Sequence, residues 1–335
     1  MNNHYKFYKF LEILKNETDE NHILTSTQLI ARLRQVTGTN TDRRAIYEYI
    51  NTLKELNFDI SDYEENGEGY YLRSSNLEEH EIRILMDLIV SCKFITHKKT
   101  NEIIEKLKQL NSNYVYDRLY KQLYIDNRVK SNNNQIFYTV DKINHAIIEN
   151  KKISFNYCHY NMWKELLPRA DENNKNKLYI VSPVAMILKQ ECYYLVAVHD
   201  NYTKASHYRM DKIRNIEILE DDRVVLEGLE EFKDGFDGAI YSKKSFRMYA
   251  GEECTVVLKM NRGLLDSIVD ELGRDVELMI DESGDIIAKF TAKYSVGLKR
   301  WIMQFGCNAE LLEPVKLRDE IKSDIIKMKD IYLKL

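Results

Sequence analysis

The residues best suited to chemistry lie between Cys192 and Ile213, where two strand patterns are joined by a short polar turn. The second pattern interrupts its apolar positions with His207, Arg209, Asp211 and Lys212. A strand buried for stability alone would not contain these side chains. They place hydrogen-bond donors beside aromatic rings, and guanidinium groups bind phosphate bidentately. The pattern therefore predicts a site for an anionic, base-like or nucleotide-like ligand.

The same stretch resembles the WYL domain of bacterial transcription regulators. The resemblance rests on Tyr193-Tyr194-Leu195, with Tyr193 in place of the family's tryptophan, and on Tyr-Arg-Met-Asp-Lys-Ile at 208–213. Upstream, Ser182-Pro183 matches the family's proline-containing strand, and residues 153–157 match its first strand. The resemblance implies an SH3-like or Sm-like β-barrel that senses a ligand.

The family's pocket of serine, histidine, tyrosine and arginine has counterparts of the same types in this sequence. The resulting ligand-binding candidates are Tyr157, Ser182, Tyr194, His207 and Arg209. Arg209 would bind an anion, and His207 would make binding pH-dependent because the pKa of a free histidine is about 6.5. The alternative is that Arg209 only pairs with Asp211, since residues two apart on a strand share a face.

Composition sets limits on the class of protein. The chain has 335 residues, of which 44% are hydrophobic and 30% charged, and this indicates two to three soluble globular domains. The net charge of -4 means that binding to nucleic acid would require a local basic patch. The amino-terminal residues lack the apolar core of a secretion signal, and no apolar run approaches the ~18 residues that span a bilayer. We therefore expect a cytoplasmic protein with no membrane partner.

The five cysteines are scattered and have no C-x-x-C spacing, so we expect no disulfide framework, metal or cofactor.

Residues 1–75 have the pattern of a winged helix-turn-helix. Apolar spacing predicts a first helix around Phe10, a second starting at Thr25 with a capping box to Gln28, and a third running from Thr41 or Asp42 through Leu56. A hairpin follows over 59–73 with a glycine-rich turn. In this arrangement the third helix enters the major groove of duplex DNA.

The expected DNA contacts come from the second and third helices. They are Arg32, Arg34, Arg43 and Arg44 to phosphates, Tyr47, Glu48 and Asn51 to bases, and Thr41 at the start of the third helix. Residues 42–56 resemble the recognition helix of DeoR-like regulators, although Ala45 and Tyr47-Glu48 differ from the family's common residues. Acidic residues at 64, 65 and 68 would repel phosphate, so the wing is not expected to be the main anchor. The alternative for this region is a three-helix module that binds protein.

The remaining sequence predicts a helical linker over 76–130, the WYL domain over 131–222 and an acidic linker over 221–244. Residues 245–335 have the order β-α-β-β-α-β, which is the ferredoxin-like order and resembles the carboxyl-terminal WCX extension of WYL regulators. We expect this extension to mediate dimerisation. The fold class is thus α+β throughout.

These features together predict a ligand-responsive homodimeric transcription regulator that binds double-stranded DNA and an anionic effector. One alternative is a module that binds single-stranded nucleic acid or RNA without an operator. Another is a nucleotide-handling enzyme, but the sequence has no serine elbow, Cys-His signature or kinase loop, and no adenylate loop. We therefore expect no catalytic residues.

Overall fold

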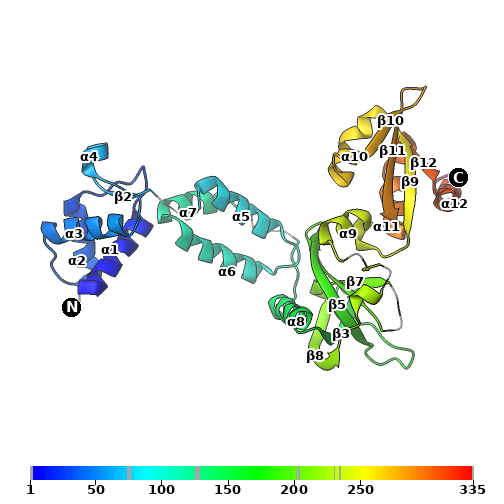
Figure 1. Ribbon diagram of the computed structural model, residues 1–335, viewed down its shortest axis with the longest axis horizontal. Coiled ribbons are helices and arrows are strands. Elements are labelled where there is room, and N and C mark those ends of the chain that lie inside the picture. Colours follow the sequence, from blue (N-terminus) through cyan, green and yellow to red (C-terminus); the bar gives the residue numbers. More distant parts are fainter. Residues whose placement is uncertain are drawn as a thin grey trace. The chain divides into compact units, whose positions relative to one another are not determined.

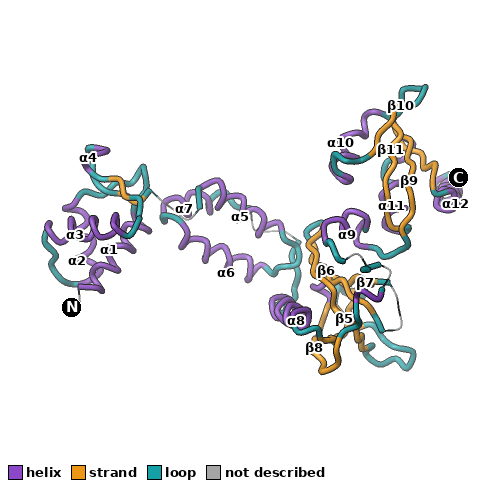
Figure 2. The backbone as a smooth tube through the Cα atoms, in the orientation of Figure 1, coloured by secondary structure: helices purple, strands orange, loops and turns teal. Residues whose placement is uncertain are grey.

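The computed structural model describes residues 3–73, 77–124, 129–200, 202, 204–229, 231–233 and 235–333. The chain divides into two compact units, Met1–Asn132 and Asn133–Leu335 (Figures 1 and 2). The division falls in the polar run at 131–135. The boundary expected between residues 75 and 76 lies outside the described residues.

The described residues of the first unit form helices and one small sheet (Figure 1). Its elements are α1 (Asn3–Glu17), α2 (Ser26–Thr37), α3 (Arg43–Glu55), β1 (Ile60–Ser61), α4 (Tyr63–Asn66), β2 (Tyr71–Leu72), α5 (Glu79–Ser91), α6 (His97–Leu107), η1 (Lys108–Leu110) and α7 (Asn113–Tyr120).

Local signals set the ends of α2 and α3. Thr25 caps α2 in a capping box with Gln28, as the sequence predicts. Gly38 ends α2 in the left-handed conformation at φ 70°, which a glycine adopts without strain, and Asp42 caps α3. The two helices pack with α1 around a core that includes Phe10, Leu29, Leu33, Ile46, Ile50 and Leu53. The three predicted helices are confirmed.

The wing differs from the expected hairpin. Its strands β1 and β2 pair antiparallel over only two residues each, and the connection between them contains the helical turn α4. Asp62 caps α4 by accepting from the amides of Glu64 and Glu65, and Gly67 ends it with a φ of 72°. A capped helical turn therefore replaces the simple glycine-rich turn.

Helices α5, α6 and α7 form a separate core after the wing. It is built from Ile82, Met86, Val90, Ile104, Val115, Tyr116 and Leu119. Ser112, which caps the start of α7, connects this core to the winged helix within the same unit, because its hydroxyl donates to Asp19 Oδ2 at 2.7 Å. The linker is thus packed structure and not an extended tether.

The second unit begins with a helix and a six-stranded antiparallel sheet (Figure 2). Its first elements are α8 (Ile136–Ile148), β3 (Lys151–Tyr160), β4 (Leu166–Pro168), β5 (Leu178–Lys189), β6 (Cys192–Val198), β7 (Ala205–Arg209), η2 (Met210–Lys212) and β8 (Ile213–Asp222).

The expected closed barrel is wrong. The strands follow the order β4-β3-β5-β6-β7, and β8 pairs with β3. Closure would require β7 to pair with β8, but among the described strands β7 pairs with β6 and β8 with β3. The three-residue turn η2 joins β7 to β8, and the two strands diverge from it to different neighbours. The sheet therefore stays open.

The acidic linker expected over 221–244 is also wrong, because most of this segment is packed. It contains η3 (Leu226–Gly228) and α9 (Gly238–Lys244), and η4 (Phe246–Met248) follows. Phe232 and Tyr241 are buried against Val196 and Val198 of β6. The apolar side chains of this segment cover one face of the sheet. They are interspersed with acidic residues, so the composition of the segment did not indicate this packing.

The carboxyl-terminal part has the predicted element order β-α-β-β-α-β. Its elements are β9 (Glu253–Met260), η5 (Arg262–Leu264), α10 (Leu265–Leu272), β10 (Glu277–Ile280), β11 (Ile286–Lys293), α11 (Val296–Met303), η6 (Gly306–Asn308), β12 (Ala309–Glu313) and α12 (Val315–Tyr332). The four strands form an antiparallel sheet in the order β10-β11-β9-β12. Ile268 of α10 and Trp301 of α11 join Leu258 of β9 in one core.

Candidate nucleic-acid interface and ligand site

Helix α3 presents one polar face to solvent. Asp42 accepts from the amide of Ala45 at 2.8 Å and fixes the first turn of the helix. Ile46, Tyr49, Ile50 and Leu53 are buried on the other face. The predicted residues Arg43, Arg44, Tyr47, Glu48 and Asn51 are all exposed on α3. The fold therefore holds the candidate DNA-contacting residues in one rigid row.

The predicted arginines differ in how they are engaged. Arg34 is exposed, whereas Arg32 forms an ion pair with Glu17 at 3.2 Å. Arg43 Nε donates to Ser26 Oγ at 3.1 Å, and Arg44 pairs with Glu48 at 3.2 Å along the helix. The Arg44–Glu48 pair is largely exposed, so it is worth about 0.3–0.5 kcal/mol and a phosphate can displace it.

Thr41 lies next to this face but is only half exposed. Its Oγ1 is buried and has no hydrogen-bond partner in the described part of the chain.

A groove of about 740 Å³ runs between α3 and the wing. Arg43, Tyr47 and Asn51 line it from α3, and Asp62, Glu64, Glu68 and Tyr70 line it from the wing. No sequence pattern predicted that the wing would place carboxylates opposite the polar face of α3. This proximity follows from the packing of α3, β1 and β2 around one core.

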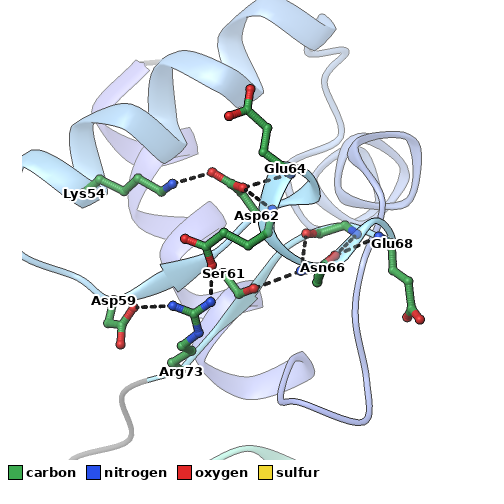
Figure 3. A network of polar contacts seen from close by, with 10 residues as sticks. Lys54, Asp59, Ser61, Asp62, Glu64, Asn66, Glu68 and Arg73 are labelled. Atoms are coloured by element: carbon green, nitrogen blue, oxygen red, sulfur yellow. Dashed lines mark hydrogen bonds and ion pairs between the residues drawn. The ribbon is translucent and has the colours of Figure 1, made fainter.

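A network of polar contacts fixes the wing in place (Figure 3). Lys54 at the end of α3 binds Asp62 Oδ2 at 2.5 Å, and this hydrogen bond keeps the pKa of Asp62 below its usual value. Asn66 donates to Ser61 Oγ at 2.9 Å and to the carbonyl of Gly69 at 3.0 Å. Helix α4 is therefore tied to α3, to β1 and to Gly69 in the segment before β2.

In the second unit, three of the five predicted ligand residues come together. Tyr194 of β6 lies opposite Arg209 of β7 in the strand register. Tyr157 reaches them from β3, because its hydroxyl accepts from the amide of Arg209 at 3.2 Å. Burial raises the pKa of Tyr194 to about 12 and also raises that of Tyr157, so both side chains are neutral hydrogen-bond donors near pH 7.

Arg209 is engaged by Asp211, which is the alternative that the strand spacing left open. Its Nε and Nη2 donate to the two carboxylate oxygens of Asp211 at 3.1 and 2.8 Å. These hydrogen bonds raise the pKa of Arg209 further above its usual value. Asp211 is buried, whereas the Arg209 side chain is 36% exposed. The exposed edge of the guanidinium is what remains for a ligand.

Ser182 and His207 are satisfied by protein groups. Ser182 is fully buried, and its Oγ accepts from the amide of Val224 at 3.0 Å. His207 Nδ1 lies 2.7 Å from the carbonyl of Met248 and Nε2 lies 2.8 Å from the Tyr241 hydroxyl. Because a carbonyl can only accept, Nδ1 carries the proton and Tyr241 donates to Nε2.

The expectation that His207 titrates near neutral pH is wrong. Burial lowers the pKa of His207 to about 4, and repulsion from Lys293 acts in the same direction. The imidazole is therefore neutral at pH 7, and His207 gives no charge to an anion there.

Two further cations lie beside Arg209. The Arg169 guanidinium lies 5.6 Å from the centre of the Tyr157 ring, and Lys212 Nζ lies 5.7 Å from that of Tyr160. Neither Arg169 nor Lys212 forms an ion pair with any of the described residues. Burial lowers the pKa of Lys212, and repulsion from Arg209 and Arg169 lowers it further. Lys212 belongs to the sequence motif, but nothing in the sequence pointed to Arg169.

The sequence did not predict a second polar cluster, which lies where the segment before α9 meets β11. Lys293 forms an ion pair with Glu231 although its side chain is only 3% exposed. Its Nζ lies 3.7 Å from the centre of the Tyr241 ring. A neighbouring cavity of about 880 Å³ is lined by Lys293, Glu231, Tyr241 and Phe236, among others.

No group of His, Cys, Asp and Glu side chains within the described ranges is arranged to hold a metal ion. Among the helices that the structure describes, none is long and apolar enough to cross a bilayer.

Comparison with known families gives two matches in the second unit. Residues 138–218 match the WYL domain, and residues 252–328 match the WCX domain. The second unit thus contains a WYL domain followed by a WCX domain. The resemblance to these two domains seen in the sequence is thereby confirmed. Tyr157, Ser182, Tyr194, His207 and Arg209 all lie in the WYL match, and Lys293 lies in the WCX match.

Two solved structures align over nearly the whole chain. The proteasome accessory factor B/C of Arthrobacter aurescens is 16% identical, covers 99% of this chain with 49% of its own length, and gives a TM-score of 0.29. A CRISPR Cas-related protein is 14% identical, covers 98% of this chain with 85% of its own, and gives a TM-score of 0.36. The WYL-domain protein spans about half the length of the first. Scores this low support no argument about function. No curated sequence matches the chain.

Proposed function

We propose that this WYL-domain protein is a transcription regulator that binds duplex DNA through α3 and responds to an anionic ligand in its WYL domain. The observation that carries the proposal is the exposed row on α3. A helix that buries Ile46, Ile50 and Leu53 while presenting arginine, tyrosine and asparagine side chains has the chemistry of a recognition helix. The preceding turn at Gly38 gives α2 and α3 the order of a helix-turn-helix.

The test of DNA binding is fluorescence anisotropy of the full chain with duplex and single-stranded probes of the same sequence. We expect the duplex to bind more tightly, with log K falling linearly as log salt rises. Arg43→Ala should reduce the magnitude of that slope by about 0.9 for the phosphate contact removed. Lys175→Ala, an exposed change in the WYL domain, is the matched control. Preference for the single strand would instead favour a single-strand or RNA-binding module.

For the ligand, the supporting feature is the set of cations around Tyr157 and Tyr160. Arg169 and Lys212 have no ion-pair partner among the described residues, and the lowered pKa of Lys212 reflects partial burial beside other cations. A bound phosphate would relieve that repulsion, and the exposed ring of Tyr160 could stack on a base. Arg209, already held by Asp211, would add donors from the side.

The ligand proposal is tested with AMP and adenosine, which differ by one phosphate. We expect AMP to raise the melting temperature more than adenosine does, and Lys212→Met with Arg169→Met to abolish the difference. Lys175→Met with Lys164→Met removes the same charge from exposed positions and should leave it unchanged. Equal responses to both compounds would contradict a phosphate site.

We also propose that the protein is a homodimer and that α12 contributes to the interface. Only Leu317 of this helix is buried, whereas Ile325, Ile326, Met328 and Ile331 are between 45% and 69% exposed. A second copy would cover this apolar surface and would place two recognition helices on half-sites about 34–36 Å apart or a multiple of that. Light scattering should give a dimer, and Ile325→Lys with Met328→Lys should give a monomer. A wild-type monomer at micromolar concentration would contradict the dimer.

A further inference from the structure

The wing carries an unusual number of carboxylates for a segment that borders a recognition helix. Within the fully described stretch 59–73 they are Asp59, Asp62, Glu64, Glu65 and Glu68. Only Arg73 in that stretch is basic. Duplex DNA is a dense array of negative charge, so the position and pairing of each carboxylate matters.

Three of these carboxylates form local ion pairs with two basic residues. Lys54 binds Asp62, and Arg73 pairs with both Asp59 and Glu65. Figure 3 shows these contacts and shows the side chains of Glu64 and Glu68 directed away from them.

Glu64 and Glu68 themselves form no ion pair within the described residues. Both are exposed, and both line the groove that α3 lines with Arg43, Tyr47 and Asn51. These two carboxylates without an ion pair therefore lie on the wall of the groove that faces the candidate base-contacting residues.

The position of this wall is fixed. Lys54 ties the cap of α4 to the last turn of α3, and Asn66 ties the end of α4 to β1 and to Gly69. The next residue, Tyr70, exchanges two backbone hydrogen bonds with Leu24 at 3.1 and 2.8 Å, and these hold the end of the wing against the segment before α2. A duplex that α3 enters thus meets Glu64 and Glu68 without a hinge to remove them.

The other side of α3 has the opposite charge. Arg34 lines a second cavity with Asn40 and Thr41, and Lys6 Nζ binds the carbonyl of Asn40 at 3.0 Å. The amino terminus of α3 is already capped by the Asp42 carboxylate, so the positive charge on this side comes from the side chains of Arg34 and Lys6. The winged helix is therefore electrostatically polarised across its recognition helix.

We propose that Glu64 and Glu68 orient the winged helix on DNA by repelling the phosphate backbone from α4, so that the duplex contacts the α2–α3 side. This inference rests on the proposed function. The wing repels the phosphate backbone of the DNA. The affinity for duplex of any sequence is therefore lower than it would be if α3 bound without these two carboxylates beside it.

The expected effect is modest for each carboxylate. A charge several ångströms from a phosphate in water changes affinity by about twofold at low salt, and screening removes most of this near 0.2 M salt. Glu64→Gln with Glu68→Gln should therefore tighten binding about three- to tenfold at 50 mM salt and less than about twofold at 200 mM.

The experiment measures anisotropy of the full chain with one 20-base-pair duplex of mixed sequence at both salt concentrations. The control variant, Glu20→Gln with Glu172→Gln, removes two exposed carboxylates that do not line the groove and changes net charge equally. We expect less than about twofold change from the control. Glu64→Lys with Glu68→Lys should tighten binding further and extend the hydroxyl-radical footprint. Melting curves establish that each variant is folded.

Equal tightening by the wing and control variants would overturn the inference, because net charge would then explain the effect. No tightening by either wing variant would also overturn it. If the wild-type chain binds duplex and the wing variants behave like wild type, only this inference fails. If no form binds duplex at 50 mM salt, the proposed function fails with it.

Discussion

Replacing Lys293 by methionine should destabilise the second unit, because it leaves the Glu231 carboxylate without its counter-ion. The Lys293 side chain is 3% exposed and that of Glu231 is 19% exposed. Breaking a buried pair typically costs 3–5 kcal/mol. Glu231 keeps its hydrogen bond from the amide of Ala205 at 2.8 Å and some contact with water, so we expect a loss of about 2–3 kcal/mol.

The double variant Lys293→Met with Glu231→Gln removes both charges and should recover most of that loss, which gives a coupling free energy of about 2 kcal/mol. Urea unfolding followed by tryptophan fluorescence reports on the second unit, since both tryptophans, Trp163 and Trp301, lie in it. A double variant as unstable as the sum of the two single variants would refute the reasoning. A single variant within about 0.5 kcal/mol of wild type would refute it as well.

Three further predictions concern stability. The pKa of His207 is about 4 in the folded state and about 6.5 in the unfolded state. As pH falls, the unfolded state therefore binds the proton first. The stabilisation is complete above pH 6.5, and the free energy of unfolding falls by about 3 kcal/mol between pH 6.5 and 4. Urea unfolding at pH 7 and pH 5 should show a smaller difference for His207→Gln, and an unchanged difference would contradict this origin. Asp62→Ala removes the cap of α4 and the partner of Lys54. The free energy of unfolding, followed by circular dichroism, should fall by about 1–2 kcal/mol, and an unchanged value would contradict the capping role. Gly251→Ala would place a Cβ 2.0 Å from the carbonyl oxygen of Tyr294, so its melting temperature should fall by several degrees, and a wild-type value would contradict the close approach.

The sequence predicted the elements whose signals are local. Thr25 and Asp42 mark the starts of α2 and α3, because each side chain accepts a hydrogen bond from the backbone amide three residues later. The pairing of Arg209 with Asp211 was also accessible as an alternative, because the two residues are two apart in the sequence, although Asp211 lies in η2 just after the end of β7. Short-range chemistry of this kind needs no knowledge of the fold.

The features that were missed depend on distant partners. His207 is bound by Tyr241 and Met248, which are 34 and 41 residues away, and Lys293 and Glu231 are 62 residues apart. The open sheet likewise depends on which strands β7 and β8 pair with. A single sequence does not encode these pairings as a readable pattern. The protein partners of Ser182 and His207, which were chosen as ligand candidates by residue type, could therefore not be predicted.

Titration of a fluorescent duplex with the wild-type chain over a series of salt concentrations tests the central claim most directly. The account predicts saturable binding at 50 mM salt, tighter for duplex than for the corresponding single strand, with an affinity that falls linearly on a log–log plot against salt. Absence of duplex binding at low ionic strength, with AMP present or absent, would contradict it.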